Sequence, residues 1–451
     1  MNETNEVKVP KRILNSLLAS LSAGVVPRVG APYIAIGRNA EISALLDSLD
    51  AVAEGGAAVR FLIGRYGSGK SFLIQLIRGH ALERGFLCAD ADLSADQRRL
   101  CGGNGAGLAT YRELLRNLAS KAAPDGGALP VVLSRHYAAV LSSLAEEGIL
   151  PESTGFADAF RKRVLADFAP LENGVGGFDF ARVLCEYFFA YAEENEEKKS
   201  ACLRWLRGEF ANKTEAKAAL GIRVSTVIDD ESWYDFIKLW ALLSRKLGYK
   251  GLIVYIDECI ILYKIVNRVA RESNYEKILT IFNDTLQGRA EGLGVIFGGT
   301  PQFLEDTRRG LFSYEALRSR LADSRFTESG YSTMSSPVMR LRRLSDNELY
   351  ALIGRLTRLF ASANADAKRL SEEEQKTFLT QALARAGAEE LVTPREIIRD
   401  YLTLLAILRD NPSASFDEVL ATQSKKPADG DGTGDAGAGG GASVGLADLD
   451  F

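Results

Sequence analysis

The sequence contains few residues that could hold a transition metal. Its 451 residues include two histidines and five cysteines, and no two cysteines form a CxxC pair. Zinc sites in proteins are usually built from closely spaced cysteine and histidine ligands, so the composition argues against such a site. The odd number of scattered cysteines and the lack of a signal peptide indicate reduced thiols in a cytoplasmic protein.

Long apolar runs and a strong net charge are also missing. No run of eighteen apolar residues occurs, which argues against a membrane-spanning helix. The net charge is −4, so bulk charge does not favour a polyanionic partner, and any nucleic-acid contact must come from a local basic face. What remains is an ordinary globular composition, 46% hydrophobic and 25% charged, with enough length for two or three packed units.

The N-terminal part of the chain has the pattern of a strand, a glycine-rich loop, a helix and a second strand. The apolar run at 57–64 predicts a buried strand. Residues 70–85 predict a helix, and 86–94 predict the second strand. This order is typical of an α/β fold with a parallel sheet. Further strands are expected at 251–258, 293–300 and 337–344.

A long helical span separates the second and third expected strands. Lys70 and Asp257 lie 257 − 70 = 187 positions apart, which exceeds what a minimal sheet needs. We therefore expect a helical insertion at 124–221. Within it, the charged run at 193–199 is interpreted as a solvated helix end.

The C-terminal part of the chain is expected to be wholly helical up to a polar tail. Ser345 and Ser371 precede acidic first turns and are predicted N-caps. The tail is rich in Gly, Asp and Ala, has almost nothing to bury and is expected to be disordered. The predicted division is a helical N-terminal segment (1–32), two parts of the core (33–123 and 222–344), the insertion (124–221), a helical lid (345–423) and the tail (424–451).

The stretch IGRYGSGKS, residues 63–71, matches the pattern GxxxxGK[ST] at every fixed position. Glycines let main-chain N–H groups curl around phosphates, and the following helix directs its positive end at them. In such a loop Lys70 would reach the β- and γ-phosphates and Ser71 would offer its hydroxyl to Mg²⁺. The predicted nucleotide-binding residues are Gly64, Arg65, Tyr66, Gly67, Ser68, Gly69, Lys70, Ser71 and Phe72.

Polar residues end two of the later strands. Asp257 and Glu258 follow the apolar run LIVYI, so Asp257 could hold a Mg²⁺ shell and Glu258 could orient an attacking water. Thr300 follows the next strand, where it would either touch the γ-phosphate or the water, or simply begin a turn. The intact Lys70, Ser71, Asp257 and Glu258 favour a working hydrolase site.

Arginines cluster after the fourth expected strand. One of them could reach a neighbouring subunit's nucleotide and stabilise charge in the transition state, and we favour Arg320 slightly over Arg318. The alternatives are a solvated helix face and a patch that binds DNA phosphates. The cluster comprises Arg308, Arg309, Arg318, Arg320 and Arg325.

One further arginine stands at a helix start. Arg395 follows Thr393 and Pro394, and proline is common at the first helical position. The helix dipole does not favour a cation there. Arg395 is therefore expected either to reach back to the nucleotide or to pack at the surface.

As an ordered set, these features resemble the AAA+ ATPases. IGRNAEISALL, with Gly37 and Arg38, is similar to the GRxxE box of the Orc/Cdc6-like and STAND-like branches, which lines the adenine pocket. Residues 63–94, 298–322 and 393–408 resemble the BREX phage-defence ATP-binding protein BrxD family. That resemblance covers most of 37–410.

The resemblance implies an AAA+ parallel sheet with a helical lid, ATP and Mg²⁺ as cofactors, and a homo-oligomer. It also implies partners among helicase-like and methylase defence proteins. Contact with double-stranded DNA through an arginine-rich face is a separate expectation, which rests on the arginine clusters themselves. The implied roles are Walker A for Lys70 and Ser71, Walker B for Asp257 and Glu258, sensor 1 for Thr300, the arginine finger for Arg318 or Arg320, and sensor 2 for Arg395.

Three functions follow from these features. The first is a self-assembling AAA+ ATPase that acts on DNA within a phage-defence complex. The second is an ATP-gated adaptor with slow hydrolysis that docks a helicase or methylase, favoured by the acidic balance and the lack of a clear winged-helix domain after the lid. The third is a DNA-binding scaffold, which rests on the cluster at 308–325 and on Arg340, Arg342 and Arg343.

Overall fold

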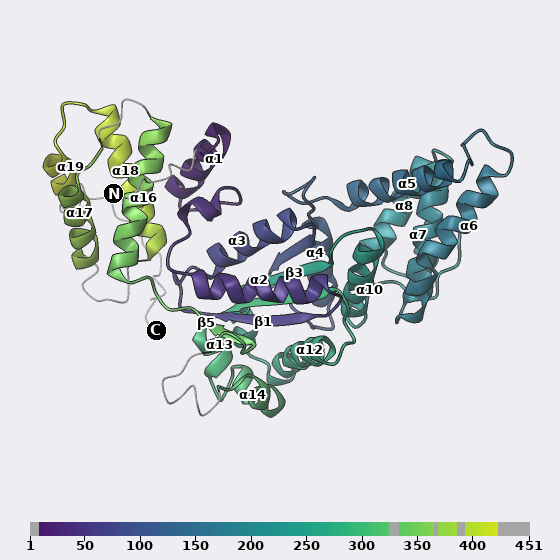
Figure 1. Ribbon diagram of the computed structural model, residues 1–451. Coiled ribbons are helices and arrows are strands. Elements are labelled where there is room, and N and C mark those ends of the chain that lie inside the picture. The colour runs from purple at the N-terminus through teal and green to yellow at the C-terminus, as the bar shows by residue number, and fades with distance from the viewer. Residues whose placement is uncertain (1–8, 324–332, 365–368, 386–392, 423–451) are drawn as a thin grey trace, which may run out of the picture.

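Five parallel strands form a single sheet at the centre of the protein. The computed structural model describes residues 9–323, 333–364, 369–385 and 393–422. The strand order is β2-β3-β4-β1-β5, and all four neighbouring pairs run parallel (Figure 1). The strands are β1 (Ala58–Ile63), β2 (Leu87–Asp92), β3 (Leu252–Asp257), β4 (Leu293–Gly299) and β5 (Val338–Arg340). The predicted α/β class with a parallel sheet is confirmed.

Helices cover both faces of this sheet, which explains why the central strands β3 and β4 are nearly continuous apolar runs. Every residue of β3 and β4 is buried. Ile253 and Tyr255 belong to the core shared with one helix layer, and Val254 and Ile256 to the core shared with the other. The first layer contains α2 (Asn39–Ala53) and α3 (Lys70–Glu83), and the second contains α4 (Ala106–Arg116), α10 (Trp233–Lys246) and α12 (Arg268–Leu286).

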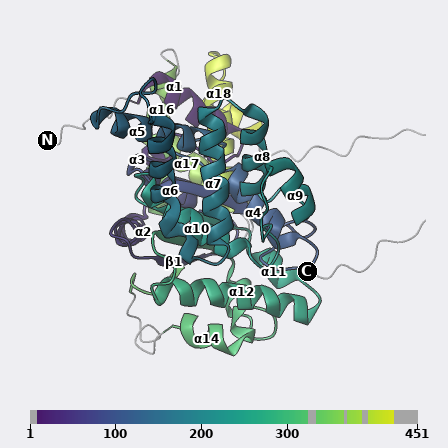
Figure 2. The ribbon, with the colours of Figure 1, turned by 90° about the vertical axis from the view of Figure 1, so that its right-hand side faces the viewer.

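A group of helices extends from one end of the sheet, seen at the right of Figure 1 and facing the viewer in Figure 2. We call α5 to α9 the outer helices. Their apolar side chains continue the core that covers α4 and α10. The charged run at 193–199 contains the end of one helix and the start of the next, because Asn195 caps α8. The group comprises α5 (Leu129–Glu146), α6 (Phe156–Phe168), η2 (Ala169–Asn173), α7 (Gly177–Ala192), α8 (Glu196–Leu206) and α9 (Lys213–Leu220).

A second helical group lies at the other end of the sheet (Figure 1). Its core joins the N-terminal helix α1 to helices from the end of the chain. Ser345 and Thr393 each form a capping box, and Ser371 accepts from the Glu374 amide, so both predicted serine caps are confirmed. The group comprises α1 (Lys11–Ser22), α16 (Asp346–Ala363), α17 (Glu372–Arg385), α18 (Pro394–Asp410) and α19 (Phe416–Thr422).

Short elements complete the chain: η1 (Ala31–Ile34), α11 (Ile260–Lys264), α13 (Pro301–Glu305), η3 (Leu311–Ser313) and α14 (Glu315–Leu321). The predicted tail at 424–451 lies outside the described residues, as does Arg325. Among the helices of the described segments, none is both long and apolar enough to cross a membrane. The domain boundaries stay a prediction.

Candidate functional site

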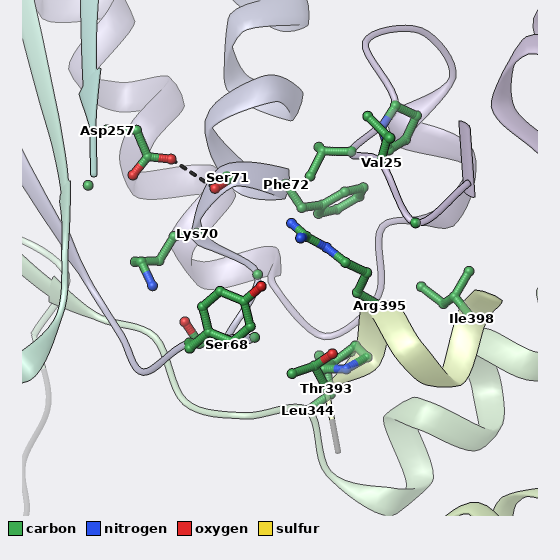
Figure 3. A pocket seen from close by; sticks show the side chains of 18 of the residues that line it. Val25, Ser68, Lys70, Ser71, Phe72, Asp257, Leu344, Thr393, Arg395 and Ile398 are labelled. Atoms are coloured by element: carbon green, nitrogen blue, oxygen red, sulfur yellow. Dashed lines mark hydrogen bonds between the residues drawn. The ribbon is translucent and has the colours of Figure 1, made fainter. Parts of the chain in front are cut away.

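A cavity of about 500 Å³ lies at the carboxyl ends of β1, β3 and β4, under the second helical group (Figure 3). In open parallel sheets this edge is the usual place for a ligand. The predicted site residues among those that line it are Arg38, Tyr66, Gly67, Ser68, Gly69, Lys70, Ser71, Phe72, Asp257, Glu258, Thr300 and Arg395.

The glycine loop forms the polar end of the cavity. Gly67 and Gly69 have φ angles of 76° and 88°, a left-handed conformation that glycine adopts without strain. The loop leads directly into α3, whose N-terminal amides carry the positive end of the helix dipole. Lys70 Nζ donates to the carbonyls of Gly64 and Arg65 at 2.8 and 3.1 Å. Burial lowers the pKa of Lys70, and the carboxylates of Asp257 and Glu258 oppose that shift.

Ser71 and Asp257 meet across the gap between α3 and β3. Ser71 Oγ donates to Asp257 Oδ2 at 2.8 Å, the dashed line in Figure 3. The Asp257 carboxylate also accepts from the Glu258 amide at 2.8 Å. Glu258 has a φ of 57°, which is uncommon outside glycine and is concentrated at functional sites. This turn places Glu258 against the cavity rather than in the sheet.

Thr300 lies where β4 ends, on the cavity wall. Its hydroxyl caps α13 by accepting from the Phe303 amide at 3.3 Å. Asp92, which the sequence did not single out, ends β2 in register with Asp257. Burial and the carboxylates of Asp257, Asp90 and Glu258 raise its pKa to about 6, so acidic groups accumulate at this edge of the sheet.

Arg395 enters the cavity from the first turn of α18, and Figure 3 shows its side chain extending toward Phe72. No other described residue accepts a hydrogen bond from its guanidinium or forms an ion pair with it. Thr393 packs so closely on the loop that a Cβ at Gly67 would lie 2.6 Å from its methyl group. The second helical group therefore contacts the glycine loop directly.

The other end of the cavity is apolar, and sequence reasoning missed it. Most of its residues come from the last turn of α1 and the strap that follows it, residues 23–36, where no motif marks them. Their position results from the packing of α1 against α16 and α18. The apolar lining comprises Leu21, Val25, Val26, Pro27, Ile34, Ile36, Leu344, Leu352 and Ile398.

Arg38 and Gly37 support the site from behind. Arg38 is buried and donates to Glu41 and to the Ser68 carbonyl, both at 2.9 Å, and also to the Arg342 carbonyl. Gly37 is not among the lining residues. A Cβ on it would lie 2.1 Å from a carboxylate oxygen of Glu348, so it allows α16 to approach closely.

Four further predicted residues, besides Gly37, lie away from the cavity lining. Gly64 supplies a carbonyl to Lys70, and Arg65 follows it in the loop. Arg318 and Arg320 lie on α14, on the exposed side of that helix. Arg320 donates to Asn283 at 3.2 Å and to the Ala316 carbonyl at 2.7 Å, whereas no described residue pairs with the Arg318 guanidinium.

The cavity fits a nucleoside triphosphate. Its volume falls in the usual range for small-molecule sites, and an amide-rich cationic end faces an apolar end. Ser71 and Asp257 offer the oxygen donors that Mg²⁺ prefers, and this ion usually takes one or two protein ligands together with phosphates. The described residues hold no group of three His, Cys, Asp or Glu that could bind a metal alone.

The comparisons with known proteins agree with this geometry. A search of curated proteins found no match. The family model described as BREX system ATP-binding protein BrxC/D matches residues 9–424, so it includes the strap, the sheet, the outer helices and the second helical group. The resemblance to the BrxD family is thereby confirmed, and the chain belongs to the BrxC/D family of BREX system ATP-binding proteins.

Proposed function

We propose that this protein is a Mg²⁺-dependent AAA+ ATPase that couples ATP binding and hydrolysis to self-assembly and to action on DNA with BREX partner proteins. In this proposal 33–123 and 222–344 form the ATPase core, 124–221 form the insertion and 345–423 form the lid. The observation that carries the proposal is the hydrogen bond from Ser71 to Asp257, beside Glu258 and opposite Arg395 in one cavity.

The glycine loop would bind the phosphates of ATP through its amides, while the apolar strap would cover the base. Lys70 would exchange its two carbonyl acceptors for phosphate oxygens, which carry full charge and form stronger hydrogen bonds. Ser71 and Asp257 would hold a magnesium ion, which would offset negative charge on the phosphates.

Glu258 would orient the attacking water and accept its proton. Its left-handed backbone turns the side chain toward the cavity, so the position is consistent with that role. Thr300 lies at the neighbouring strand end, where a hydroxyl could hold the same water or the γ-phosphate. Arg395 would stabilise the negative charge of the γ-phosphate from the lid side.

Self-assembly would complete the site. Arg318 and Arg320 lie on the exposed face of α14 and do not line the chain's own cavity. An arginine in such a position could reach a neighbour's nucleotide, where it would stabilise charge in the transition state. Among the described residues the Arg318 guanidinium has no partner, whereas Arg320 donates to Asn283, so these contacts favour Arg318, the reverse of the slight preference drawn from the sequence.

A second function has one observation in its favour. No residue of 124–221 lines the nucleotide cavity, although this span includes five helices with a shared core. Such a separate group suits an ATP-gated adaptor, in which ATP binding sets the conformation, hydrolysis is slow and the outer helices dock a helicase or methylase.

ATP turnover of the purified protein decides between the two functions. Turnover per chain would be measured against protein concentration, with and without double-stranded DNA, beside Glu258→Gln. Under the ATPase proposal, turnover per chain rises with concentration or DNA, and Glu258→Gln binds ATP without hydrolysing it. Tight ATP binding with flat, negligible turnover would instead support the adaptor.

A further inference from the structure

A second cavity, of about 530 Å³, lies where the outer helices join the sheet. It shares no lining residue with the nucleotide cavity. Its walls come from the loop after β2, from α4, from the start of α5 and from the residues after α8. We call it the arginine cavity, because Arg98, Arg112, Arg116 and Arg207 line it together with Glu113 and Glu209.

The four guanidinium groups keep most of their hydrogen-bond donors unused. Arg98 donates only through Nε, to the Asp92 carbonyl at 2.8 Å. Arg112 donates through Nε and Nη2 to the Gly208 carbonyl. Arg116 donates to the nearby Glu113 at 2.9 Å. Each guanidinium has five N–H groups, so all three have donors left for a ligand.

Arg207 is the least satisfied of the four. Its one charged neighbour among the described residues is Glu209, with 3.9 Å between Nη1 and Oε1, which is beyond hydrogen-bond range. Four arginines therefore stand against two glutamates, of which Glu113 already accepts from Arg116. The remaining positive charge is local, in a chain whose net charge is −4.

Tertiary packing brings Arg207 to this place. The Tyr111 hydroxyl of α4 donates to the Leu206 carbonyl at the end of α8, at 2.6 Å. Trp240 of α10 donates to the same hydroxyl at 2.9 Å. Because Tyr111 and Trp240 are buried, the residue next to Leu206 is fixed against α4, and the four arginines face one cavity rather than separate patches of surface.

We propose that the arginine cavity binds phosphate groups of a nucleic-acid backbone. Guanidinium groups suit phosphate oxygens because their donors match two acceptors at once. No aromatic side chain is among the residues that line the cavity, so bases have nothing to stack on and the contact is independent of sequence. The inference rests on the proposed action on DNA and moves the contact from the arginines near α14 to the base of the outer helices.

This cavity is connected to the nucleotide site by one main-chain hydrogen bond and one hydrogen bond from the Arg98 side chain. The Leu93 amide donates to the Asp257 carbonyl at 3.1 Å. Arg98 donates to the Asp92 carbonyl one residue earlier. A phosphate bound by Arg98 would therefore act on the end of β2, which is hydrogen-bonded to the strand end that carries Asp257, and this would give DNA a physical route to the ATP site.

The test is a nucleotide-free binding experiment on the full chain. Fluorescence anisotropy would follow a labelled mixed-sequence DNA, as single strand and as duplex, over a range of salt concentrations. The variant is Arg116→Ala/Arg207→Ala, and the control Arg12→Ala/Arg268→Ala removes two exposed arginines elsewhere. Circular dichroism melts would compare the stability of both double variants with that of the wild type.

The cavity variant is expected to bind DNA about 10- to 100-fold more weakly at low salt. Its plot of log K against log salt should be shallower by about two units, because each lost phosphate contact removes roughly one. The control should match the wild type. Equal DNA affinity and equal salt slope for all three proteins would overturn the proposal. Displacement of DNA by micromolar pyrophosphate would also overturn it, because the arginine cavity would then be a site for a small phosphate ligand. Because the DNA-binding experiment contains no ATP, its result does not depend on ATP turnover. A failure of the ATPase proposal can therefore be distinguished from a failure of DNA binding at the arginine cavity.

Discussion

The Arg38 guanidinium donates to the main-chain carbonyl of Ser68 at 2.9 Å, across 30 positions of sequence. The same side chain donates to Glu41 and to the Arg342 carbonyl. Arg342 follows β5 and leads to the second helical group. One buried arginine thus holds the glycine loop, the start of α2 and the connection to the second helical group in a fixed relation.

Replacing Arg38 should therefore cost both stability and nucleotide affinity. Arg38→Ala leaves the buried Glu41 without its cation, and breaking a buried pair costs about 3–5 kcal/mol. The free energy of unfolding from urea titration would measure this. The control is Arg84→Ala, whose ion pair with Asp50 is exposed and should contribute at most about 1 kcal/mol.

The variant Arg38→Lys distinguishes the loss of stability from the loss of nucleotide affinity. Lysine keeps the positive charge near Glu41 but lacks the planar fork that reaches two carbonyls at once. This variant should recover much of the stability while binding ATP more weakly than the wild type. Equal ATP affinity for Arg38→Lys and wild type would show that the Ser68 contact does not order the loop.

The polar half of the site could be predicted from the sequence because its residues follow short-range rules. GxxxxGKS specifies a loop conformation, and two acids after an apolar run must lie at a strand end. Because β1 and β3 run parallel on either side of β4, the loop and helix start that follow β1 lie at the same edge as the end of β3, and Ser71 meets Asp257 there. The spacing and composition of a few neighbouring residues were enough for this part.

The apolar half could not be predicted, because its position depends on contacts far apart in sequence. Val25 and Pro27 belong to no motif, and they reach the cavity only because α1 packs on α16 and α18. The arginine cavity was missed for the same reason. Arg98 and Arg207 are 109 positions apart (207 − 98), and only the packing of α8 against α4 unites them.

Arg395 provides a test of lid contact with ATP. Its guanidinium lines the cavity without a partner among the described residues, so its removal should not change stability. Arg395→Ala should weaken ATP binding about 10-fold, or ~1.4 kcal/mol. Isothermal titration calorimetry would measure the affinity. Arg399→Ala is the matched control, since Arg399 lies one turn later and pairs with Asp400. Equal weakening by both substitutions would indicate a general disturbance of α18.

The arginine finger can be located by mixing variants. The Arg318→Ala chain keeps its own nucleotide site but no longer offers Arg318 to the nucleotide of a neighbouring subunit. If Arg318 is the finger, ATP turnover should fall on the order of 10³-fold. Arg320→Ala is the parallel variant, because Arg320 already donates to Asn283. The inactive Lys70→Ala chain still carries both arginines. Adding it to Arg318→Ala should restore turnover, and a mixture that stays inactive would contradict action on a neighbouring subunit.

The junction between the sheet and the second helical group should weaken in acid through Glu348. Arg342 donates to both carboxylate oxygens at 2.6 Å, and the Ser345 amide donates at 2.8 Å. These contacts lower the pKa of Glu348 to about 2. Because the pKa of Glu348 is lower in the folded state than the ordinary value of 4.5, its carboxylate stabilises the folded state above about pH 4.5. That contribution is lost as the pH falls from 4.5 toward 2.

In Glu348→Gln the side chain at position 348 no longer titrates. The difference in the free energy of unfolding between this variant and the wild type therefore reports the contribution of the Glu348 carboxylate. At pH 7 the variant should be less stable than the wild type by about 1 kcal/mol, the usual cost of losing a cap. This difference in the free energy of unfolding should stay constant down to about pH 4.5 and shrink below it. Only the wild type has a carboxylate at position 348 that loses its charge in that range. Urea unfolding of both proteins between pH 7 and pH 3 would measure this difference.

Glu373→Gln is the control, since Glu373 pairs with Lys376 at the surface. The stability of this variant should follow that of the wild type at every pH. A Glu348→Gln difference that grows as the pH falls would contradict the assigned direction of the pKa shift.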